Sequence, residues 1–276
     1  MQNRKWEIDK LLEIRYQVRQ KSPLIHCITN PISIHDCANA VLAVGARPIM
    51  AEHPGEVCEI TDTAKALAVN LGNITNVRME SMLLAGRCAR KKDIPVVIDL
   101  VGVGCSSLRL AYGRRFLEEC SPWVIKGNLS ELKALAGVEN HADGIDVGEK
   151  DRITKDSVFY SEELLKDLSR KYKAVVMATG EIDLVTDGQD FYTIENGCKM
   201  LAKVTGTGCM LNVLTAAFLS EKQSVESSLL ALLLMGVSGE LANQTQGPAT
   251  FQIQLMDLLY GITDMELRQK CRIQKR

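Results

Sequence analysis

The chain has 276 residues, of which 46% are hydrophobic and 24% are charged, a composition typical of a soluble globular protein with a large core. Its 33 basic and 34 acidic residues give a formal net charge of -1, which excludes a global attraction to nucleic acid or to an anionic membrane. The charged N-terminal segment lacks the apolar core of a signal peptide, and the nine cysteines show no C-x-x-C pair and no zinc-like spacing. We therefore expect reduced thiols and a cytoplasmic protein.

Short apolar runs alternate with amphipathic stretches over the first two thirds of the chain. This alternation predicts a mostly parallel sheet with helices on both faces, the architecture of a three-layer α/β/α fold. Ligands of such sheets bind beyond the carboxyl ends of the strands. The expected strands are 24–28, 48–50, 66–71, 95–99, 123–126 and 174–178, and the expected helices include 5–20, 33–44 and 77–90.

The last third of the chain departs from this alternation. An Asp-Gly pair separates two β-prone runs in residues 182–194, which predicts a hairpin at the sheet edge. Residues 209–269 are expected to form consecutive helices, and the nearly uncharged stretch 227–239 is too short for a membrane span, so we expect it to be buried. The polar loop 139–155 suits a surface insertion. We find no linker, so we expect one domain over residues 1–276.

A glycine-rich turn at residues 205–209 (Thr-Gly-Thr-Gly-Cys) leads directly into an apolar, helix-like run. The first N–H groups of a helix have no internal partner, so such a turn can hold a phosphate. Cys209 would lie in the same field, which should make its thiol more acidic and suit it to accept a proton. A capping turn with a small buried thiol explains the same residues, because short glycine-rich turns are common.

Polar side chains follow several of the predicted strands, namely Asn70, Asp99, Lys126 and Thr179. Asp99 could contact magnesium or could cap the next turn. Lys126, Asn128 and Glu131 provide the cation, amide and carboxylate that a magnesium nucleotide needs, although Asn128 and Glu131 also have the spacing of a helix-capping box. Thr179 could offer its hydroxyl to a phosphate, but strand-to-hairpin turns use the same residue type.

Two further residues invite a functional interpretation. His26 lies within a predicted strand and has no partner at metal-ligand spacing, so we expect a structural histidine. Met50 comes at the end of a strand and could line an apolar pocket, although most methionines of the chain should be packed in the core.

In this order, the segments resemble those of the hydroxyethylthiazole kinase family, a thiamine-salvage family with a ribokinase-like fold. The resemblance covers most of the chain and is sharpest at residues 23–30 (PLIHCITN) and 45–50 (GARPIM). It implies a single ribokinase-like α/β domain with an edge hairpin. The other matching segments are 38–40, 70–72, 99–104, 126–131, 178–180 and 206–209.

The resemblance also implies an activity, which is ATP-dependent phosphorylation of the hydroxyl of 4-methyl-5-(2-hydroxyethyl)thiazole with magnesium. It implies a homotrimer with active sites between subunits, and no nucleic acid or membrane partner. By position, Cys209 matches the proposed base, Met50, Gly206 and Asn30 the thiazole contacts, Lys126, Thr179, Asn128 and Gly208 the ATP contacts, and Asp99 and Glu131 the magnesium positions.

The chain departs from the family pattern at three places. Leu100 stands where proline is usual, which should loosen the strand-end turn. Lys126 stands where arginine is common, which replaces a bidentate phosphate contact with a point charge. Gly148 stands where a serine is often found. We expect these departures to affect nucleotide affinity, because no group essential to phosphoryl transfer is lost.

Two other functions fit parts of the sequence. The first is a related kinase that acts on a hydroxymethylpyrimidine or on pyridoxal, against which residues 23–30 and 45–50 argue. The second is a non-catalytic binding protein with the same fold, which would be expected to lose Asp99, Glu131 or the turn at 206–208. All of these are present.

Overall fold

The computed structural model describes residues 2–146, 148–151, 153, 157–244 and 246–276. Within these residues, nine strands form one sheet in the order β2-β1-β3-β4-β5-β6-β7-β8-β9. The strands from β2 to β6 are parallel, and the strands from β6 to β9 pair antiparallel. The strands are β1 (Leu24–Ile28), β2 (Arg47–Ile49), β3 (Ala66–Asn70), β4 (Val96–Asp99), β5 (Val124–Asn128), β6 (Val175–Thr179), β7 (Asp183–Thr186), β8 (Phe191–Ile194) and β9 (Ile273–Lys275).

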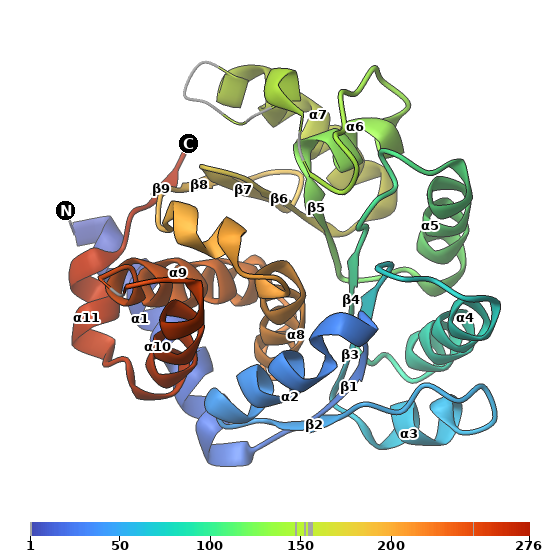
Figure 1. Cartoon of the computed structure of the whole chain (residues 1–276), viewed down its shortest axis with the longest axis horizontal. Helices are drawn as coiled ribbons and strands as arrows, with labels where there is room; N and C mark the ends of the chain where they lie inside the picture. Colours follow the sequence, from blue (N-terminus) through green and yellow to red (C-terminus); the bar gives the residue numbers. More distant parts are fainter. Residues whose placement is uncertain (1, 147, 152, 154–156, 245) are drawn as a thin grey trace.

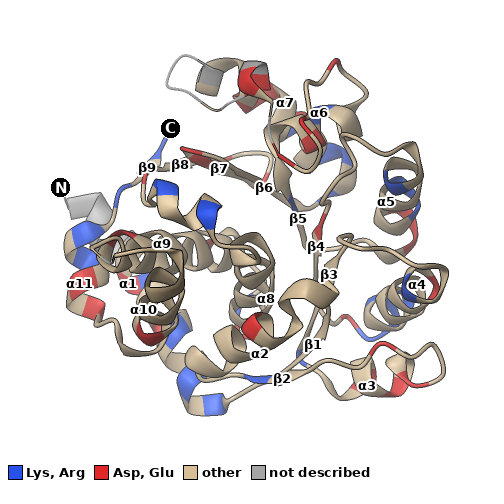
Figure 2. Cartoon of the chain, viewed as in Figure 1, with Lys and Arg blue, Asp and Glu red and all other residues tan. Residues whose placement is uncertain are grey.

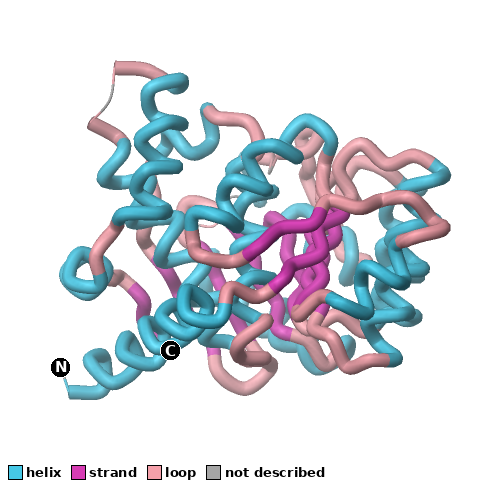
Figure 3. Tube along the Cα trace, turned by 90° about the horizontal axis from the view of Figure 1, so that it is seen from below, coloured by secondary structure: helices cyan, strands magenta, loops and turns pink. Residues whose placement is uncertain are grey.

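Helices cover both faces of this sheet (Figure 1), and the view in Figure 3 shows the strands enclosed between them. The two termini lie on the same side of the molecule in both views. The α-helices are α1 (Gln2–Lys21), α2 (Ile34–Ala43), α3 (Val57–Thr63), α4 (Asn76–Lys91), α5 (Ser107–Cys120), α6 (Leu129–Ala136), α7 (Ser157–Tyr172), α8 (Thr207–Leu219), α9 (Val225–Ala242), α10 (Pro248–Gly261) and α11 (Asp264–Lys270). Short 3-10 turns are η1 (Pro31–Ser33), η2 (Glu149–Asp151) and η3 (Lys199–Lys203).

Alternate residues of each central strand build two hydrophobic cores. In β4, Val97 faces one core, while Val96 and Ile98 face the other. Side chains of α1, α2, α8, α9 and α10 complete the first core, and side chains of α3, α4, α5, α6 and α7 complete the second. Burial on both faces explains why these strands are continuous apolar runs.

The α/β architecture and the mostly parallel sheet are therefore confirmed. The predicted position of the hairpin is wrong in one respect, because β9 pairs with β8 and forms the edge of the sheet. This strand is a short run near the C-terminus, so no local pattern distinguishes it. Helix α3 was also not predicted.

Helix α9 is long and apolar enough to cross a membrane by length and composition, but 78% of it is buried inside the structure. It packs against α8, α10 and α1. The prediction of a buried helix in this region is therefore confirmed.

Cys58 of α3 and Cys88 of α4 form a disulfide. The expectation that all nine cysteines are reduced is thus wrong for this pair, whereas the other seven, all of them described, are free. The two helices pack side by side, which places the two cysteines 5.7 Å apart between Cα atoms. Their separation of 30 residues in sequence carries no sign of this contact. The cysteine count therefore gives no support to a reducing compartment.

Basic and acidic residues are interspersed on the outer helices α4, α5 and α11 (Figure 2), in agreement with the net charge of -1. The fold thus presents no evident single-signed face in this view.

Substitution of Phe116 provides a test of packing in the second core. It lies on α5 with no exposed surface and packs among the residues of that core. We predict that Phe116→Ala lowers the free energy of unfolding by about 3–5 kcal/mol, because it removes apolar contacts and leaves a cavity. Phe159→Ala is the matched control, because 71% of Phe159 is exposed. Urea unfolding measures both variants, and equal stabilities would contradict the assignment.

Candidate functional site

The carboxyl ends of the parallel strands bring the predicted polar residues to one edge of the sheet. Asn70 of β3 pairs in register with Asp99 of β4, which pairs in turn with Lys126 of β5. Two residues farther along, Asn128 of β5 pairs with Thr179 of β6. These residues therefore form a row across four strands, at the edge where parallel sheets bind ligands.

A buried ion pair lies at the centre of this row. The Lys126 Nζ atom is 2.8 Å from Asp99 Oδ2, and the side chains are only 4% and 2% exposed. Asn70 Nδ2 donates to the same oxygen at 3.0 Å. Burial lowers the pKa of Lys126, but the Asp99 carboxylate and its hydrogen bond raise this pKa above its usual value overall. We therefore expect Lys126 to stay charged at neutral pH.

Glu131 lies beside this pair and also caps α6. Its Oε2 atom accepts from the Asn128 backbone N–H at 2.7 Å, and Asn128 Oδ1 accepts from the Glu131 N–H at 2.9 Å, which confirms the capping box. Its Oε1 atom accepts from the Gly102 N–H at 2.8 Å. Burial, with a contribution from Asp99, raises the pKa of Glu131 to about 8. Much of the ligand-free protein therefore holds a proton on this carboxyl at neutral pH.

The glycine-rich turn begins α8, which packs against β3 and β4. Gly206 is the N-cap of this helix, with a left-handed φ of +92° and no side-chain hydrogen bond to the cap. An added Cβ at Gly206 would lie 3.0 Å from the Ser33 Cβ, so glycine also permits close packing. At Gly208, the corresponding position lies 3.7 Å from Lys126 Nζ. The free N–H groups of the helix start and the Lys126 cation therefore lie next to each other.

Cys209 lies at the start of α8, with 8% of its surface exposed. Its Sγ atom is 3.5 Å from Asn70 Nδ2. Burial and the Asp99 carboxylate raise the pKa of Cys209, and they outweigh the opposing effects of Ser33, Lys126 and Asn70. The prediction that this thiol is more acidic than usual is therefore wrong, because burial and the nearby Asp99 carboxylate disfavour its thiolate.

Asn30 lies on the β1 side of the row. Its Oδ1 atom accepts from the Ile32 N–H at 3.2 Å and from Asn73 Nδ2 at 3.1 Å, so it caps η1 and contacts the loop after β3. The side chain is thus fixed from two sides at the carboxyl edge.

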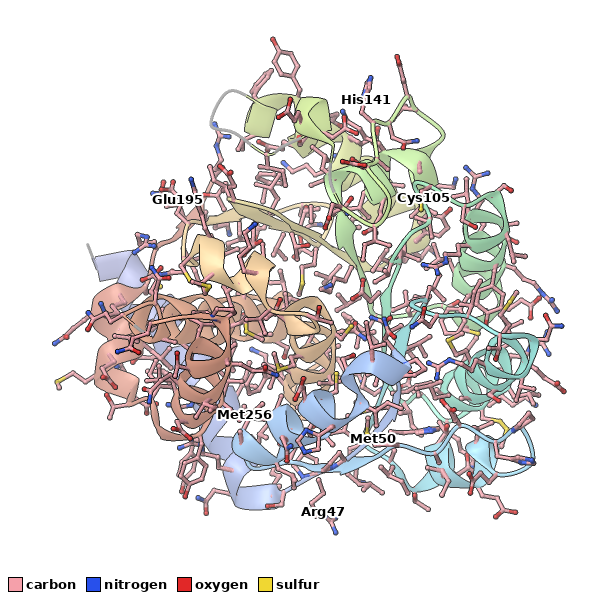
Figure 4. The ribbon with its side chains drawn as sticks, in the orientation of Figure 1. Arg47, Met50, Cys105, His141, Glu195 and Met256 are labelled. Atoms are coloured by element: carbon pink, nitrogen blue, oxygen red, sulfur yellow. A yellow bond between two sulfur atoms is a disulfide. The ribbon has the colours of Figure 1, made fainter. Side chains whose placement is uncertain are left out.

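Met50 directly follows β2, which ends at Ile49, and packs against the first core (Figure 4). The next residue is held by His26, whose Nε2 atom is 2.8 Å from the Ala51 carbonyl oxygen. The His26 Nδ1 atom is 2.9 Å from Thr61 Oγ1. Both ring nitrogens are thus satisfied within the fold, as expected for a structural histidine.

Arg78 of α4 joins the loop after Met50 to the loop that carries Asn30. Its guanidinium donates to the Glu52 carboxylate and to the Thr29 carbonyl oxygen, and its side chain is 5% exposed. Arg78 therefore clamps two segments that the sequence associated with substrate, and sequence reasoning missed it.

Thr179 ends β6 on the opposite side of the row. In the turn that follows, Asp183 Oδ1 accepts from the Gly180 N–H at 2.9 Å. Burial raises the pKa of Asp183 to about 7, although Gly180 and Lys126 oppose the shift. Asp183 is thus a further carboxyl near Lys126 that sequence reasoning assigned only to the hairpin.

The predicted site residues therefore divide into a central group and a pair at the two ends of the row. Asn70, Asp99, Lys126 and Cys209 converge at the centre, and Glu131 is coupled electrostatically to Asp99 and Lys126 there. Met50 follows β2, and Thr179 is the last residue of β6. These two strands are five strand spacings apart in the sheet, so the two residues lie roughly 24 Å from each other. The site is thus an extended row rather than a compact cluster.

A model of the "Hydroxyethylthiazole kinase family" matches residues 16–265. The chain belongs to this family. It is 51% identical over 262 residues to hydroxyethylthiazole kinase 2 of Clostridium botulinum, covering 95% of this chain and 99% of that protein. The structure of a hydroxyethylthiazole kinase protein from Pyrococcus horikoshii OT3 matches with a TM-score of 0.88 and 30% identity, over 97% of this chain and 99% of that chain. A ribokinase-like superfamily protein from Enterococcus faecalis matches with a TM-score of 0.63 and 12% identity, over 87% and 88% of the two chains, and shows the fold alone.

Two departures from the family pattern have a structural account. The Leu100 N–H donates to the Lys126 carbonyl oxygen at 2.9 Å, a bond that proline could not make, so the expectation of a looser turn is wrong. At Gly148, an added Cβ would lie 1.5 Å from the His141 carbonyl oxygen. The backbone of this loop therefore leaves no room for a serine.

A separate cavity of about 1350 Å³ lies at the other end of the sheet. Its walls include Trp123 and Ala174, which precede β5 and β6, and residues 187–190 of the β7–β8 turn. None of the predicted site residues lines it. The cavity is therefore distinct from the row at the carboxyl edge.

Glu131 provides a prediction about pH. Its pKa rises from about 4.5 to about 8 on folding, so between these values the folded chain binds more protons than the unfolded chain. This group should therefore reduce folding stability as the pH increases through that window, by up to about 1.4 kcal/mol per pH unit. Glu131→Gln keeps a side chain that can complete the capping box but cannot titrate.

We expect the stability of Glu131→Gln relative to the original protein to increase from pH 5 to pH 8, as measured by urea unfolding at each pH. A constant difference across the window would show that the carboxyl has an ordinary pKa.

Proposed function

We propose that this protein transfers the γ-phosphoryl group of ATP to the hydroxyl of 4-methyl-5-(2-hydroxyethyl)thiazole, the reaction of a hydroxyethylthiazole kinase in thiamine salvage. The observation that carries the proposal is the convergence of the Lys126 cation, the free N–H groups at the start of α8 and the Cys209 sulfur. These groups suit a transferring phosphoryl group and the hydroxyl that receives it. Family membership supplies the substrate class.

Positioning and charge do most of the chemical work in this proposal. Lys126 and the amides at Gly206 and Gly208 hold the γ-phosphate in line with the substrate hydroxyl. The bond between the γ-phosphorus and the bridging oxygen of ADP breaks as the bond to the hydroxyl oxygen forms. The Cys209 thiolate takes the hydroxyl proton. Since the pKa of Cys209 is raised, only a minor thiolate fraction exists at neutral pH, and turnover should rise as the pH increases.

The two substrates would lie on opposite sides of this point. The thiazole ring would contact Met50, Gly206 and Asn30, toward the β2 and β1 side of the sheet. ATP would extend toward Thr179 and Asn128, on the β5 and β6 side, with Gly208 near its phosphates. We place the protein in the cytoplasm, which membership in a family of metabolic kinases supports.

The carboxylates of this site offer magnesium few free oxygen atoms for direct coordination. Asp99 Oδ2 accepts from Lys126 and Asn70, and both oxygens of Glu131 accept backbone N–H groups. Within the described residues, no cluster of three or more His, Cys, Asp or Glu side chains forms a metal cage. This donor set suits an ion that keeps most of its water and binds mainly through phosphate oxygens, as magnesium does. Asp99 and Glu131 would hold its water shell, and the ion would offset phosphate charge.

Turnover measurements test the proposed function. We expect ATP consumption with the thiazole alcohol and little with a hydroxymethylpyrimidine or pyridoxal under the same conditions. Cys209→Ala should retain nucleotide binding but lose about 10²–10⁴-fold in turnover, the usual contribution of a general base. Nucleotide affinity measured by calorimetry is the control. Equal turnover in Cys209→Ala would refute the role of the thiol, and preference for another alcohol would refute the substrate.

We further propose a homotrimer with active sites between subunits. Support comes from the exposed apolar side chains Ile32, Leu42 and Ile253 on η1, α2 and α10, of which Ile32 lies two residues after Asn30. Helices α2 and α10 pack together, and Gln252 donates to Asp36 between them at 3.0 Å. Neighbouring exposed apolar residues of this kind favour a subunit contact.

Light scattering coupled to gel filtration tests the oligomer. We expect the original chain to have three times the monomer mass of 30.5 kDa and Leu42→Glu with Ile253→Glu to yield monomers with impaired turnover. Leu108→Glu is the control, because Leu108 is 58% exposed on α5, away from this surface. A fully active monomer would disprove the shared site.

A further inference from the structure

Asn70 has a side-chain orientation that its neighbours determine. It is the last residue of β3 and has no exposed surface. Its Oδ1 atom is 2.8 Å from the Gly72 backbone nitrogen, which can only donate. The amide oxygen must therefore face Gly72, and the amide nitrogen must face the opposite direction.

On that opposite side, the amide nitrogen meets two acceptors. Asp99 Oδ2 lies 3.0 Å away and Cys209 Sγ lies 3.5 Å away. An amide nitrogen has two protons to donate and cannot accept, so the sulfur must be the acceptor. Asn70 thus supplies one N–H to each of two groups that would otherwise repel each other when both are negative.

The framework around this contact is fixed from both sides. Asn212, one turn after Cys209 on α8, donates from Nδ2 to the Val69 carbonyl oxygen at 3.0 Å. Val69 immediately precedes Asn70, so α8 and β3 are joined at adjacent points. The distance between the Asn70 amide and the sulfur is therefore set by the fold and not by the side chains alone.

We propose that Asn70 is a positioning residue for phosphoryl transfer, which holds the Cys209 sulfur as a hydrogen-bond acceptor beside the Asp99–Lys126 ion pair. The proposal rests on the function proposed above for Cys209. The charged or titratable groups coupled to the sulfur are Asp99 from β4, Lys126 from β5 and Cys37 from α2. Burial and Asp99 disfavour a thiolate, and Ser33, Lys126 and Asn70 favour it.

A comparison of the Asn70→Asp and Asn70→Ala variants distinguishes this role from simple packing. The aspartate keeps the shape of the side chain and can accept from Gly72, but its second oxygen cannot donate to the sulfur when ionised. Asn70→Ala removes the donor without adding a negative charge. A packing role predicts that the alanine variant is the more damaged, whereas the proposed role predicts that the aspartate variant is.

Steady-state kinetics provide the first measurement. We expect kcat to fall by about 10²-fold or more in Asn70→Asp and by less in Asn70→Ala, with KM for ATP changed less than about threefold in both. If Asn70→Asp does not fold, Asn70→Ala decides the question: loss of kcat at unchanged KM supports the role, and unchanged kcat overturns it.

Alkylation of Cys209 in the ligand-free protein provides the second measurement, followed by mass spectrometry of its peptide after iodoacetamide treatment at one fixed pH. Only the thiolate reacts, so we expect Asn70→Asp to slow this reaction by about tenfold. Asn196→Ala is the matched control. Asn196 is also buried, but its side chain bonds to Glu240, Lys270 and Arg272 rather than to the residues around Cys209, so its loss should reduce stability but not the alkylation rate.

The two measurements distinguish the inference from the proposed function. An alkylation rate in Asn70→Asp equal to that of the original protein would overturn the role of Asn70, whether or not the enzyme turns over thiazole alcohol. Absence of turnover with the thiazole alcohol in the original protein would instead refute the proposed function, and slower alkylation in Asn70→Asp would still support the contact with the sulfur.

Discussion

The buried ion pair of Asp99 and Lys126 is the interaction on which the site depends. Removing both charges from water is costly, and the pair is tolerated because Asn70 also donates to the carboxylate and because the free N–H groups of α8 lie nearby. Lys126 is also coupled to Glu131 and Cys209. The charge of this one lysine therefore influences the protonation of several groups around it.

Several carboxyl groups of the ligand-free site have raised pKa values in this arrangement. Burial raises the pKa of Glu131 to about 8 and the pKa of Asp183 to about 7. A magnesium nucleotide brings positive and negative charge together, and cation binding to carboxylates displaces protons. Binding of the magnesium nucleotide should thus be linked to ionisation of these carboxyl groups. We therefore expect nucleotide affinity itself, and not only the rate of phosphoryl transfer, to depend on pH.

Sequence patterns predicted the parts of the structure that local rules determine. Continuous apolar runs identified β3, β4, β5 and β6 because parallel strands are buried on both faces, and the spacing of Asn128 and Glu131 identified the capping box. Long-range contacts were not predictable. Strand β9, the Cys58–Cys88 disulfide and the Arg78 clamp all join segments far apart in the chain, and no local pattern marks them. The prediction of an acidic Cys209 was wrong for the same reason, since burial by distant segments and the Asp99 carboxylate raise the pKa of this thiol.

The two interpretations that the sequence left open for the strand-end residues are compatible in the folded protein. Glu131 caps α6 and Asn70 binds the turn after β3, yet both also face the ion pair. Electrostatic catalysis requires groups that do not reorganise during the reaction. Hydrogen bonds to the backbone provide this rigidity, because they fix each side chain before any ligand arrives. The structural bonds of these residues are therefore the means by which their polar atoms are preorganised for phosphoryl transfer.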